Sequence, residues 1–251
     1  MNPADPILAF ALMAGAMVAV AALYGSVGHG GASGYLAVMA LAGLAPAVMK
    51  PTALALNLVV SALAAFAFWR AGHGAWRLFW PFALGSVPFA FLGGFLRVPA
   101  GAFHLLVALA LLCAALRLAW PSAVRSPLRD LPRAPAIVIG AGLGLLSGLT
   151  GVGGGIYLSP ILLLARWADA KDGAALSALF ILVNSAAALS AHLLADRAVP
   201  SLALSLAPFV LLGGALGAWL GTQRLSSLVI RRGLAGALAL AGVKLVFPLI
   251  P

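Results

Sequence analysis

The sequence predicts an all-α, polytopic integral membrane protein made of two inverted repeats, each with about five apolar segments. Hydrophobic residues make up 64% of the 251 residues, and charged residues only 8%. A soluble domain carries about 25% charged residues, so this chain cannot cover a surface that faces water. The second observation is a set of glycine and proline motifs that occurs in the same order in both halves.

Composition also excludes other classes of protein. Intrinsic disorder needs low hydrophobicity, which this chain lacks. The single cysteine, Cys113, excludes a disulfide framework and a zinc site built from cysteines. The formal net charge is +10, but the basic residues stand between apolar runs. They therefore indicate membrane topology, and we expect no nucleic-acid partner.

Eight apolar segments are long enough to cross a bilayer, which takes about 20 residues. They are 6–24, 51–69, 78–96, 100–119, 134–150, 173–195, 200–222 and 233–250. The first lacks the positive region of a secretory signal, so we interpret it as a retained membrane helix. Two shorter segments, 35–49 and 156–167, each follow a glycine-rich stretch. The total is 8–10 membrane segments, because the glycine-rich pieces form either broken helices or re-entrant hairpins.

The longest polar stretch, 120–133, divides the chain. It contains three prolines and three arginines, and we interpret it as a cytoplasmic linker. The predicted organisation is a first transmembrane repeat over 1–119, the linker over 120–133, and a second transmembrane repeat over 134–251.

The evidence for duplication is a series of matched motifs. Four glycines recur 123 residues later: Gly25, Gly28, Gly30 and Gly31 as Gly148, Gly151, Gly153 and Gly154. The run 88–94 recurs as 208–214, and between these motifs Thr52 and Asn57 match Ser177 and Asn184 at offsets of 125 and 127. Glycine pairs and prolines are common in membrane helices, but three matches in one order favour a duplication. An odd number of segments in each half makes the second half inverted, a design known from transporters.

The basic residues predict the orientation. If the loops alternate between sides, one side receives eleven basic residues: Arg70, Arg77, Arg117, Arg125, Arg129, Arg133, Arg166, Lys171, Arg224, Arg231 and Arg232. The other receives four: Lys50, Arg97, Arg197 and Lys244. By the positive-inside rule the first side is cytoplasmic. We therefore expect a multi-pass protein of the bacterial inner membrane with both termini outside.

The glycine-rich stretches 25–34 and 147–155 are the candidate site. Clustered glycines interrupt a helix, and irregular backbone inside a bilayer is tolerated where it lines a cavity or is buried in protein. The N-terminus of the helix that follows carries free N–H groups and roughly half a positive charge, which suits an anion. The candidate binding residues here are Gly28, His29, Gly30 and Gly31 in the first turn and Gly151, Gly153, Gly154 and Gly155 in the second. The alternative is close helix packing by small residues.

Other polar residues complete the candidate site. Thr52, Asn57, Ser177 and Asn184 lie in apolar segments, where they either contact substrate or bind neighbouring helices. His29 is ionisable within the membrane and could donate to an anion or carry a proton. Lys50 could draw an anion toward the site, but we interpret it as an interfacial lysine whose stem snorkels.

The run Gly151-Val152-Gly153-Gly154-Gly155 followed by Pro160 resembles the signature of the sulfite exporter TauE/SafE family of membrane permeases. The resemblance extends over nearly the whole chain. It implies a permease for small anions, often sulfur oxyanions or organosulfonates. The first half departs from the pattern with His29 inside the motif, Ala32 in place of the third glycine, and Ala37 where the second half has Pro160.

The favoured function is therefore a secondary transporter of a small anion, with lipid and the anion as its partners and with no cofactor and no metal. A passive anion channel is the first alternative. An intramembrane enzyme is the second, and we expect none: Ser/His chemistry would use Ser26 or Ser33 with His29, which are too close in sequence to form an obvious site. All five acidic residues, Asp5, Asp130, Asp169, Asp172 and Asp196, fall in predicted loops or at helix ends, so paired-carboxylate and metal chemistry lack their residues.

Overall fold

The computed structural model describes residues 6–74, 76–119, 127–223, 239 and 243. Nine helices lie in these ranges: α1 (Pro6–Ser26), α2 (Ala32–Leu41), α3 (Pro46–Arg70), α4 (Trp76–Phe95), α5 (Ala100–Ala119), α6 (Arg133–Thr150), α7 (Gly155–Leu164), α8 (Ala170–Leu194) and α9 (Ser201–Gln223). Six of them are long and apolar enough to cross a membrane, namely α1, α3, α4, α6, α8 and α9. The predicted all-α, polytopic membrane fold is confirmed.

The helix bounds follow the predicted apolar segments closely, with two exceptions before α3. The predicted segment 35–49 is wrong, because α2 ends at Leu41 and a short turn follows. The predicted start of the next helix at 51 is also wrong, because Pro46 occupies the first turn and α3 begins there. A proline at the first helical position costs no hydrogen bond. Pro51 is then an internal residue of α3, which puts Lys50 inside a membrane helix.

The remaining predicted segments are helical over nearly the predicted ranges, and the segment 233–250 lies outside the described residues. Of the predicted linker 120–133, residues 127–132 are described, and they are not helical. At the start of α8, the Asp169 carboxylate accepts hydrogen bonds from the backbone N–H groups of Lys171 and Asp172. This is an N-cap, and it fixes where the helix begins.

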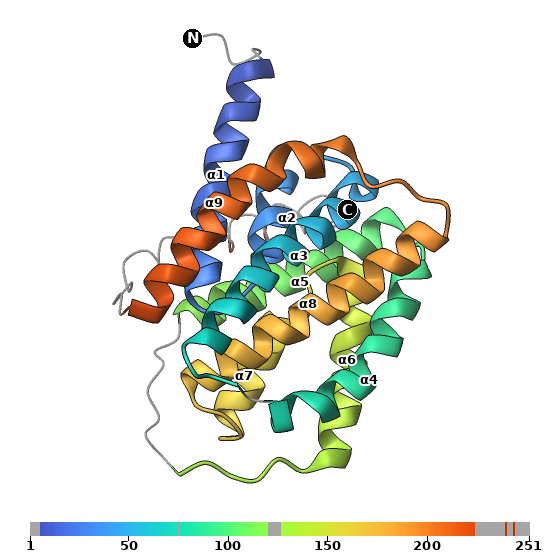
Figure 1. The fold of residues 1–251 in the computed structure, drawn as a ribbon. Coiled ribbons are helices and arrows are strands. Elements are labelled where there is room, and N and C mark those ends of the chain that lie inside the picture. Colours follow the sequence, from blue (N-terminus) through green and yellow to red (C-terminus); the bar gives the residue numbers. More distant parts are fainter. Residues whose placement is uncertain (1–5, 75, 120–126, 224–238, 240–242, 244–251) are drawn as a thin grey trace.

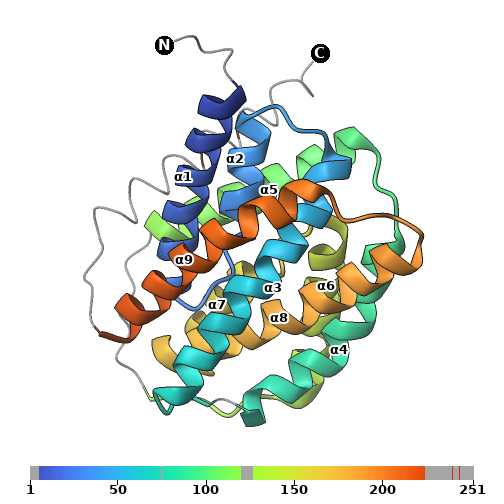
Figure 2. The ribbon, with the colours of Figure 1, turned by 45° about the horizontal axis from the view of Figure 1, so that its top comes forward.

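The helices are arranged around a central pair. Figure 2 shows α3 and α8 in the middle, with α1 and α9 on one side and α4 and α6 on the other. The closest packed pairs are α4 with α6 and α1 with α9, followed by α8 with α4 and α3 with α8 and α9. Each outer pair thus joins one helix from the first half of the chain to one from the second half (Figure 1).

Small residues make the outer pairs close. Gly140, Gly144 and Gly148 of α6 recur every four residues and face the α4 carbonyl oxygens of Phe82, Ser86 and Ala90. On the other side, Gly213 and Gly217 of α9 face the α1 carbonyl oxygens of Val18 and Ala22. A side chain at any of these five glycines would overlap the neighbouring backbone, so these glycines serve helix packing.

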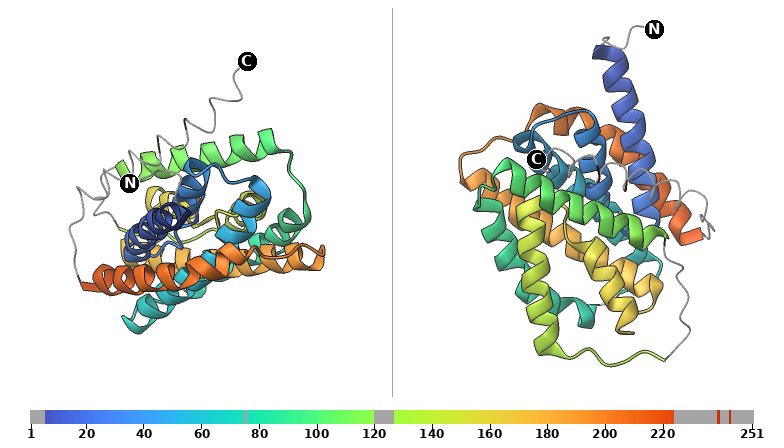
Figure 3. Two further views of the ribbon diagram at one scale, coloured as in Figure 1. Left: turned by 90° about the horizontal axis from the view of Figure 1, so that it is seen from above. Right: turned by 180° about the vertical axis from the view of Figure 1, so that it is seen from behind.

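The two short helices, α2 and α7, are enclosed by the long ones. At about 1.5 Å per residue, their ten residues each span about 15 Å, half of a hydrocarbon core of about 30 Å. Figure 3 shows α5 lying across the back of the molecule, and it contacts both α2 and α7. Tyr35 and Leu36 of α2 are fully buried, as are Leu158 and Leu162 of α7. The short helices therefore begin inside the protein, at the glycine turns, whereas their last residues, Leu41 and Leu164, are exposed.

Candidate functional site

Both breaks are turns built on left-handed glycines. In the first turn Gly28 and Gly31 have φ values of 73° and 94°; in the second Gly151, Gly153 and Gly154 have values of 79°, 83° and 78°. Residues with a Cβ rarely adopt this conformation, so glycine is required at each position. The turns are shorter than the predicted stretches 25–34 and 147–155, because α1 continues to Ser26 and α2 begins at Ala32.

The two turns meet at the crossing of α3 and α8. A Cβ on Gly30 of the first turn would contact Asn57 and Ile181. A Cβ on Gly153 of the second turn would contact the same two side chains, at 2.7 Å from Asn57 Nδ2 and 2.8 Å from Ile181 Cγ2. The structure thus brings together candidate residues from both halves of the chain around one asparagine.

Asn57 connects the turns through hydrogen bonds. Its Oδ1 accepts from the Ala32 N–H at 3.1 Å, at the start of α2. Its Nδ2 donates to the Val152 carbonyl oxygen of the second turn at 3.4 Å and to Ser185 Oγ of α8 at 3.3 Å. The side chain is fully buried. Asn57 therefore supplies the first N–H of α2 with an acceptor and holds the second turn beside it.

A second polar chain runs from the first turn through α7 to α8. His29 Nε2 lies 3.0 Å from Ser159 Oγ, and Ser159 Oγ lies 2.7 Å from Ser177 Oγ. His29 Nδ1 lies 2.8 Å from the Val27 carbonyl oxygen, which can only accept. Nδ1 therefore carries a hydrogen, and in the neutral ring Nε2 accepts from Ser159. Ser159 and Ser177 are buried, whereas His29 is half-buried.

The other glycine candidates pack against helices. Gly28 lies against the backbone of Ala174 at the start of α8, and Gly151 lies 3.0 Å, measured from an added Cβ, from the Lys50 carbonyl oxygen in α3. Gly154 faces Phe180 and Gly155 faces Ile181, while Gly31 faces the ring of Tyr35. These contacts support the packing alternative for the glycines themselves, since a Cβ at each would meet protein atoms.

Two candidates stand apart from this network. Asn184 donates to the Phe180 carbonyl oxygen of its own helix, and its Oδ1 is buried without a partner. Thr52 Oγ1 is also buried without a partner. The sequence comparison aligned Asn57 with Asn184, but the contacts in the structure align Asn57 with a different residue of α8. Gly30 and Gly153 each contact both Asn57 and Ile181, so the residue of α8 that corresponds to Asn57 is Ile181, 124 positions later.

Lys50 is not an interfacial lysine that snorkels. Its side chain is 8% exposed, and its Nζ donates to the Gly93 carbonyl oxygen of α4 at 2.9 Å. The interpretation was wrong because it placed Lys50 before the helix, whereas α3 begins four residues earlier. The ammonium group therefore points into the protein, toward the C-terminal end of α4.

Sequence reasoning missed three serines of this region. Ser159 joins His29 to Ser177, Ser185 accepts from Asn57, and Ser61 donates to the Asn57 carbonyl oxygen at 2.6 Å. A signal existed in the spacing: Ser61 follows Asn57 by four residues, and Ser185 follows Ser177 by eight, so each pair shares one helix face. Ser159 had no such partner in the sequence, because its partner His29 lies 130 residues away.

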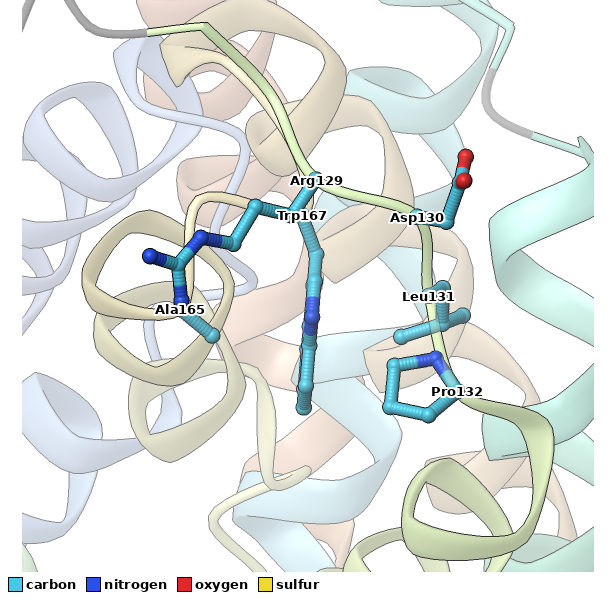
Figure 4. Close-up of a pocket in the computed structure, with 6 residues that line it drawn as sticks. All are labelled: Arg129, Asp130, Leu131, Pro132, Ala165 and Trp167. Carbon is cyan, nitrogen blue, oxygen red and sulfur yellow. The ribbon is translucent and has the colours of Figure 1, made fainter.

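One pocket in the described residues lies away from the turns. It has a volume of about 470 Å³ and lies between the segment 129–132 and the residues that follow α7, Ala165 and Trp167. Figure 4 shows the Arg129 side chain directed toward Ala165, while Asp130 points the other way. The backbone N–H of Arg129 donates to the Arg166 carbonyl oxygen at 2.7 Å. The pocket thus belongs to the contact between the linker and the α7–α8 loop.

Comparison with known proteins gives two matches. The family model described as "Sulfite exporter TauE/SafE" matches residues 12–245. The "Probable membrane transporter protein y4hK" of Sinorhizobium fredii is 38% identical over 237 residues, which cover 92% of this chain and 96% of that protein. No solved structure matches the chain.

Proposed function

The chain belongs to the sulfite exporter TauE/SafE family, and from this premise we propose that it moves a small anion across the cytoplasmic membrane by alternating access. The favoured substrate is sulfite, another sulfur oxyanion or an organosulfonate. The observation that carries the proposal is the meeting of both glycine turns at the α3/α8 crossing, beside His29, Ser159 and Ser177.

The chemistry of this region suits an oxyanion. An oxyanion only accepts hydrogen bonds, and the start of α7 offers backbone N–H groups together with roughly half a positive charge. One turn further along α7, the Ser159 hydroxyl is joined to Ser177 and His29. With a neutral His29 ring both hydroxyls donate within the polar chain, so the region offers backbone N–H donors, and the Ser159 O–H joins them once the ring is protonated. The hydrogen bonds of Lys50 and Arg197 and the His73–Asp172 pair lie outside this chain.

The duplicated architecture supports alternating access. In inverted-repeat transporters the substrate site lies near the bilayer midplane, where broken helices of the two repeats meet. Here both breaks fall between a long helix and a ten-residue helix. Each outer pair, α4 with α6 and α1 with α9, combines the two halves. We propose that the repeats over 1–119 and 134–251 rock against one another around Asn57.

His29 is the proposed element of proton coupling. In the neutral ring, Ser159 donates to Nε2; when Nε2 gains a proton it becomes a donor, and the Ser159 O–H must turn away from the ring. Tyr24 is the titratable side chain whose ring contacts His29, at 6.4 Å between centroids. Without coupling, export of an anion is still driven by the inside-negative potential, by about 2.3 kcal/mol per charge per 100 mV.

The experiment is sulfite flux into liposomes that contain the purified protein. Ser177→Ala should lower the flux at least several-fold, because it removes a hydroxyl from the polar chain. Ser61→Ala is the matched control: Ser61 is equally buried, but its hydroxyl donates to the backbone of its own helix. Equal flux in the two variants would remove the polar chain from the substrate site. His29→Gln should flatten the dependence of flux on pH between about pH 5 and pH 8.

The two alternatives make different predictions. A passive channel gives a current with a reversal potential set by the anion gradient, whereas a carrier shows saturable flux and counterflow. The 3.0 Å contact of Ser159 with His29 also has the geometry of a serine nucleophile and its base. Labelling of the purified protein by a fluorophosphonate, lost in Ser159→Ala, would favour that enzyme. We expect no labelling.

The proposed orientation has a direct test. In a Cys113→Ala background, Leu128→Cys places a thiol in the linker and Asp196→Cys places one in the α8–α9 loop, both at exposed positions. An impermeant thiol reagent added to intact cells should label the second variant and leave the first unlabelled. The reverse result would mean that the orientation of the protein in the membrane is opposite to the one proposed.

A further inference from the structure

We propose that Lys50, His192 and Arg197 form a second binding site for a small oxyanion, at the end of the α3/α8 crossing where α4 terminates. The inference rests on the proposed function, since the ligand class is the same. The site differs from the glycine turns in that it uses side-chain cations.

Two cations converge on the last turn of α4. Lys50 Nζ donates to the Gly93 carbonyl oxygen at 2.9 Å, and Arg197 Nη2 donates to the Phe95 carbonyl oxygen at 2.9 Å. Each cation uses one of several donors in these contacts. The Arg197 Nε is buried and has no hydrogen-bond partner. Donors therefore remain available after the end of α4 is satisfied.

His192 supplies the second observation. Its side chain is 7% exposed, and neither ring nitrogen has a hydrogen-bond partner, although the ring lies near the backbone of Ala198. Lys50 and Arg197 both lie within electrostatic range of this ring, and Lys50 and Arg197 lie within electrostatic range of each other. Buried polar groups without partners are rare in proteins and call for a specific explanation. An oxyanion bound among the three side chains provides one.

The charge balance favours an anion here: the exposed Asp196, next to Arg197 in the sequence, is the one carboxylate at this end of α8, and no ion pair joins it to Lys50 or Arg197 among the described residues. The C-terminus of α4 contributes only about half a negative charge. Among the described residues, the single ion-pair contact joins His73 to Asp172, at the opposite end of α8. Capping of α4 by cations explains why Lys50 and Arg197 bind its carbonyl oxygens, but it gives no reason for a buried, unpartnered imidazole beside them.

The cluster adjoins the second glycine turn. A Cβ on Gly151 would lie 3.0 Å from the Lys50 carbonyl oxygen and 3.4 Å from its Cγ. An anion held by Lys50 would therefore lie on the same stretch of α3 that supports the turn. We infer that the cluster is a secondary binding site from which the anion moves to the glycine turns.

The test is equilibrium binding of sulfite, with sulfate as a second probe, to the full chain in detergent. His192→Leu should weaken binding roughly tenfold, and its melting temperature should be equal or higher, because an apolar side chain needs no hydrogen-bond partner. Arg197→Gln should also weaken binding, while its amide can still donate to the Phe95 carbonyl oxygen. His104→Leu, in α5, is the control and should bind as the wild type does.

The outcomes separate this inference from the proposed function. If the wild type binds and transports sulfite and both variants bind it with unchanged affinity, the cluster is a helix cap and the inference is overturned. The same holds if His192→Leu loses stability together with affinity and Arg197→Gln binds normally. If the wild type neither binds nor transports any sulfur oxyanion, the proposed function itself fails.

Discussion

The two glycine turns share a backbone design but differ in what faces the helix that follows. In the first turn, the Ala32 N–H at the start of α2 donates to Asn57 Oδ1. The corresponding residue of the second turn is Gly155, 123 positions later, and it faces the apolar side chain of Ile181. One short helix thus has its first donor satisfied by a neighbouring helix, whereas the other has an aliphatic side chain in that place.

This difference assigns separate tasks to the turns. The first turn is closed by Asn57 and contributes the half-buried His29, whose ring reaches Ser159 of α7. The second turn has three left-handed glycines in four residues, and its Val152 N–H donates to Thr150 Oγ1, at the end of α6, at 3.3 Å. We therefore expect the start of α7, more than the start of α2, to meet the anion.

The largest expected effect is that of Asn57→Ile, which gives α3 the side chain that α8 has. The change leaves the buried Ala32 N–H and Val152 carbonyl oxygen without their partner, at a cost of about 1–3 kcal/mol for each group. The melting temperature in detergent should fall by many degrees. Asn184→Ile is the control, because Asn184 binds its own helix. An equal loss in the two variants would contradict the bridging role of Asn57.

A smaller loss of stability is expected for Gly154→Ala. The left-handed conformation costs an alanine about 1–2 kcal/mol, and the added Cβ would lie 2.8 Å from the Phe180 ring. Gly43→Ala carries the same conformational cost, with φ 75° but open space around it. Thermal unfolding of both variants should therefore show Gly154→Ala as the less stable. Equal melting temperatures would mean that Phe180 moves aside for the added Cβ at no measurable cost in stability.

The sharpest effect on function, with a smaller part of the effect in stability, is expected for Ile181→Asn, although Ile181 is 2% exposed and a buried polar side chain in its place also lowers the melting temperature. This variant gives α7 the side-chain acceptor that α2 already has. If the anion meets the start of α7, the new acceptor competes for the N–H groups and repels the ligand, so sulfite affinity should fall roughly tenfold, the worth of a hydrogen bond to a charged group. If the folded variant binds sulfite with unchanged affinity at a temperature well below its melting point, the anion does not meet the start of α7.

The candidate site was predictable only in part. The need for left-handed glycines is local, so both turns were found from the sequence, and His29 was found because it lies within one of them. The asparagines were harder. Both are buried polar residues in apolar helices, and only the packing shows that Asn57 faces the two turns while Asn184 binds Phe180 of its own helix. A difference of three residues in the assumed register was enough to exchange Asn184 for Ile181.

By itself, the sequence determined the fold class and, apart from the start of α3, the approximate bounds of the long helices, because the free energy of placing a segment in a membrane depends on its own apolar residues. The tertiary structure decided which polar groups meet. Ser159 binds His29 across 130 positions of sequence, and Lys50 is buried because Pro46 starts α3 early enough to turn the ammonium toward α4. Such contacts depend on the packing of helices from both halves, and no local pattern encodes them.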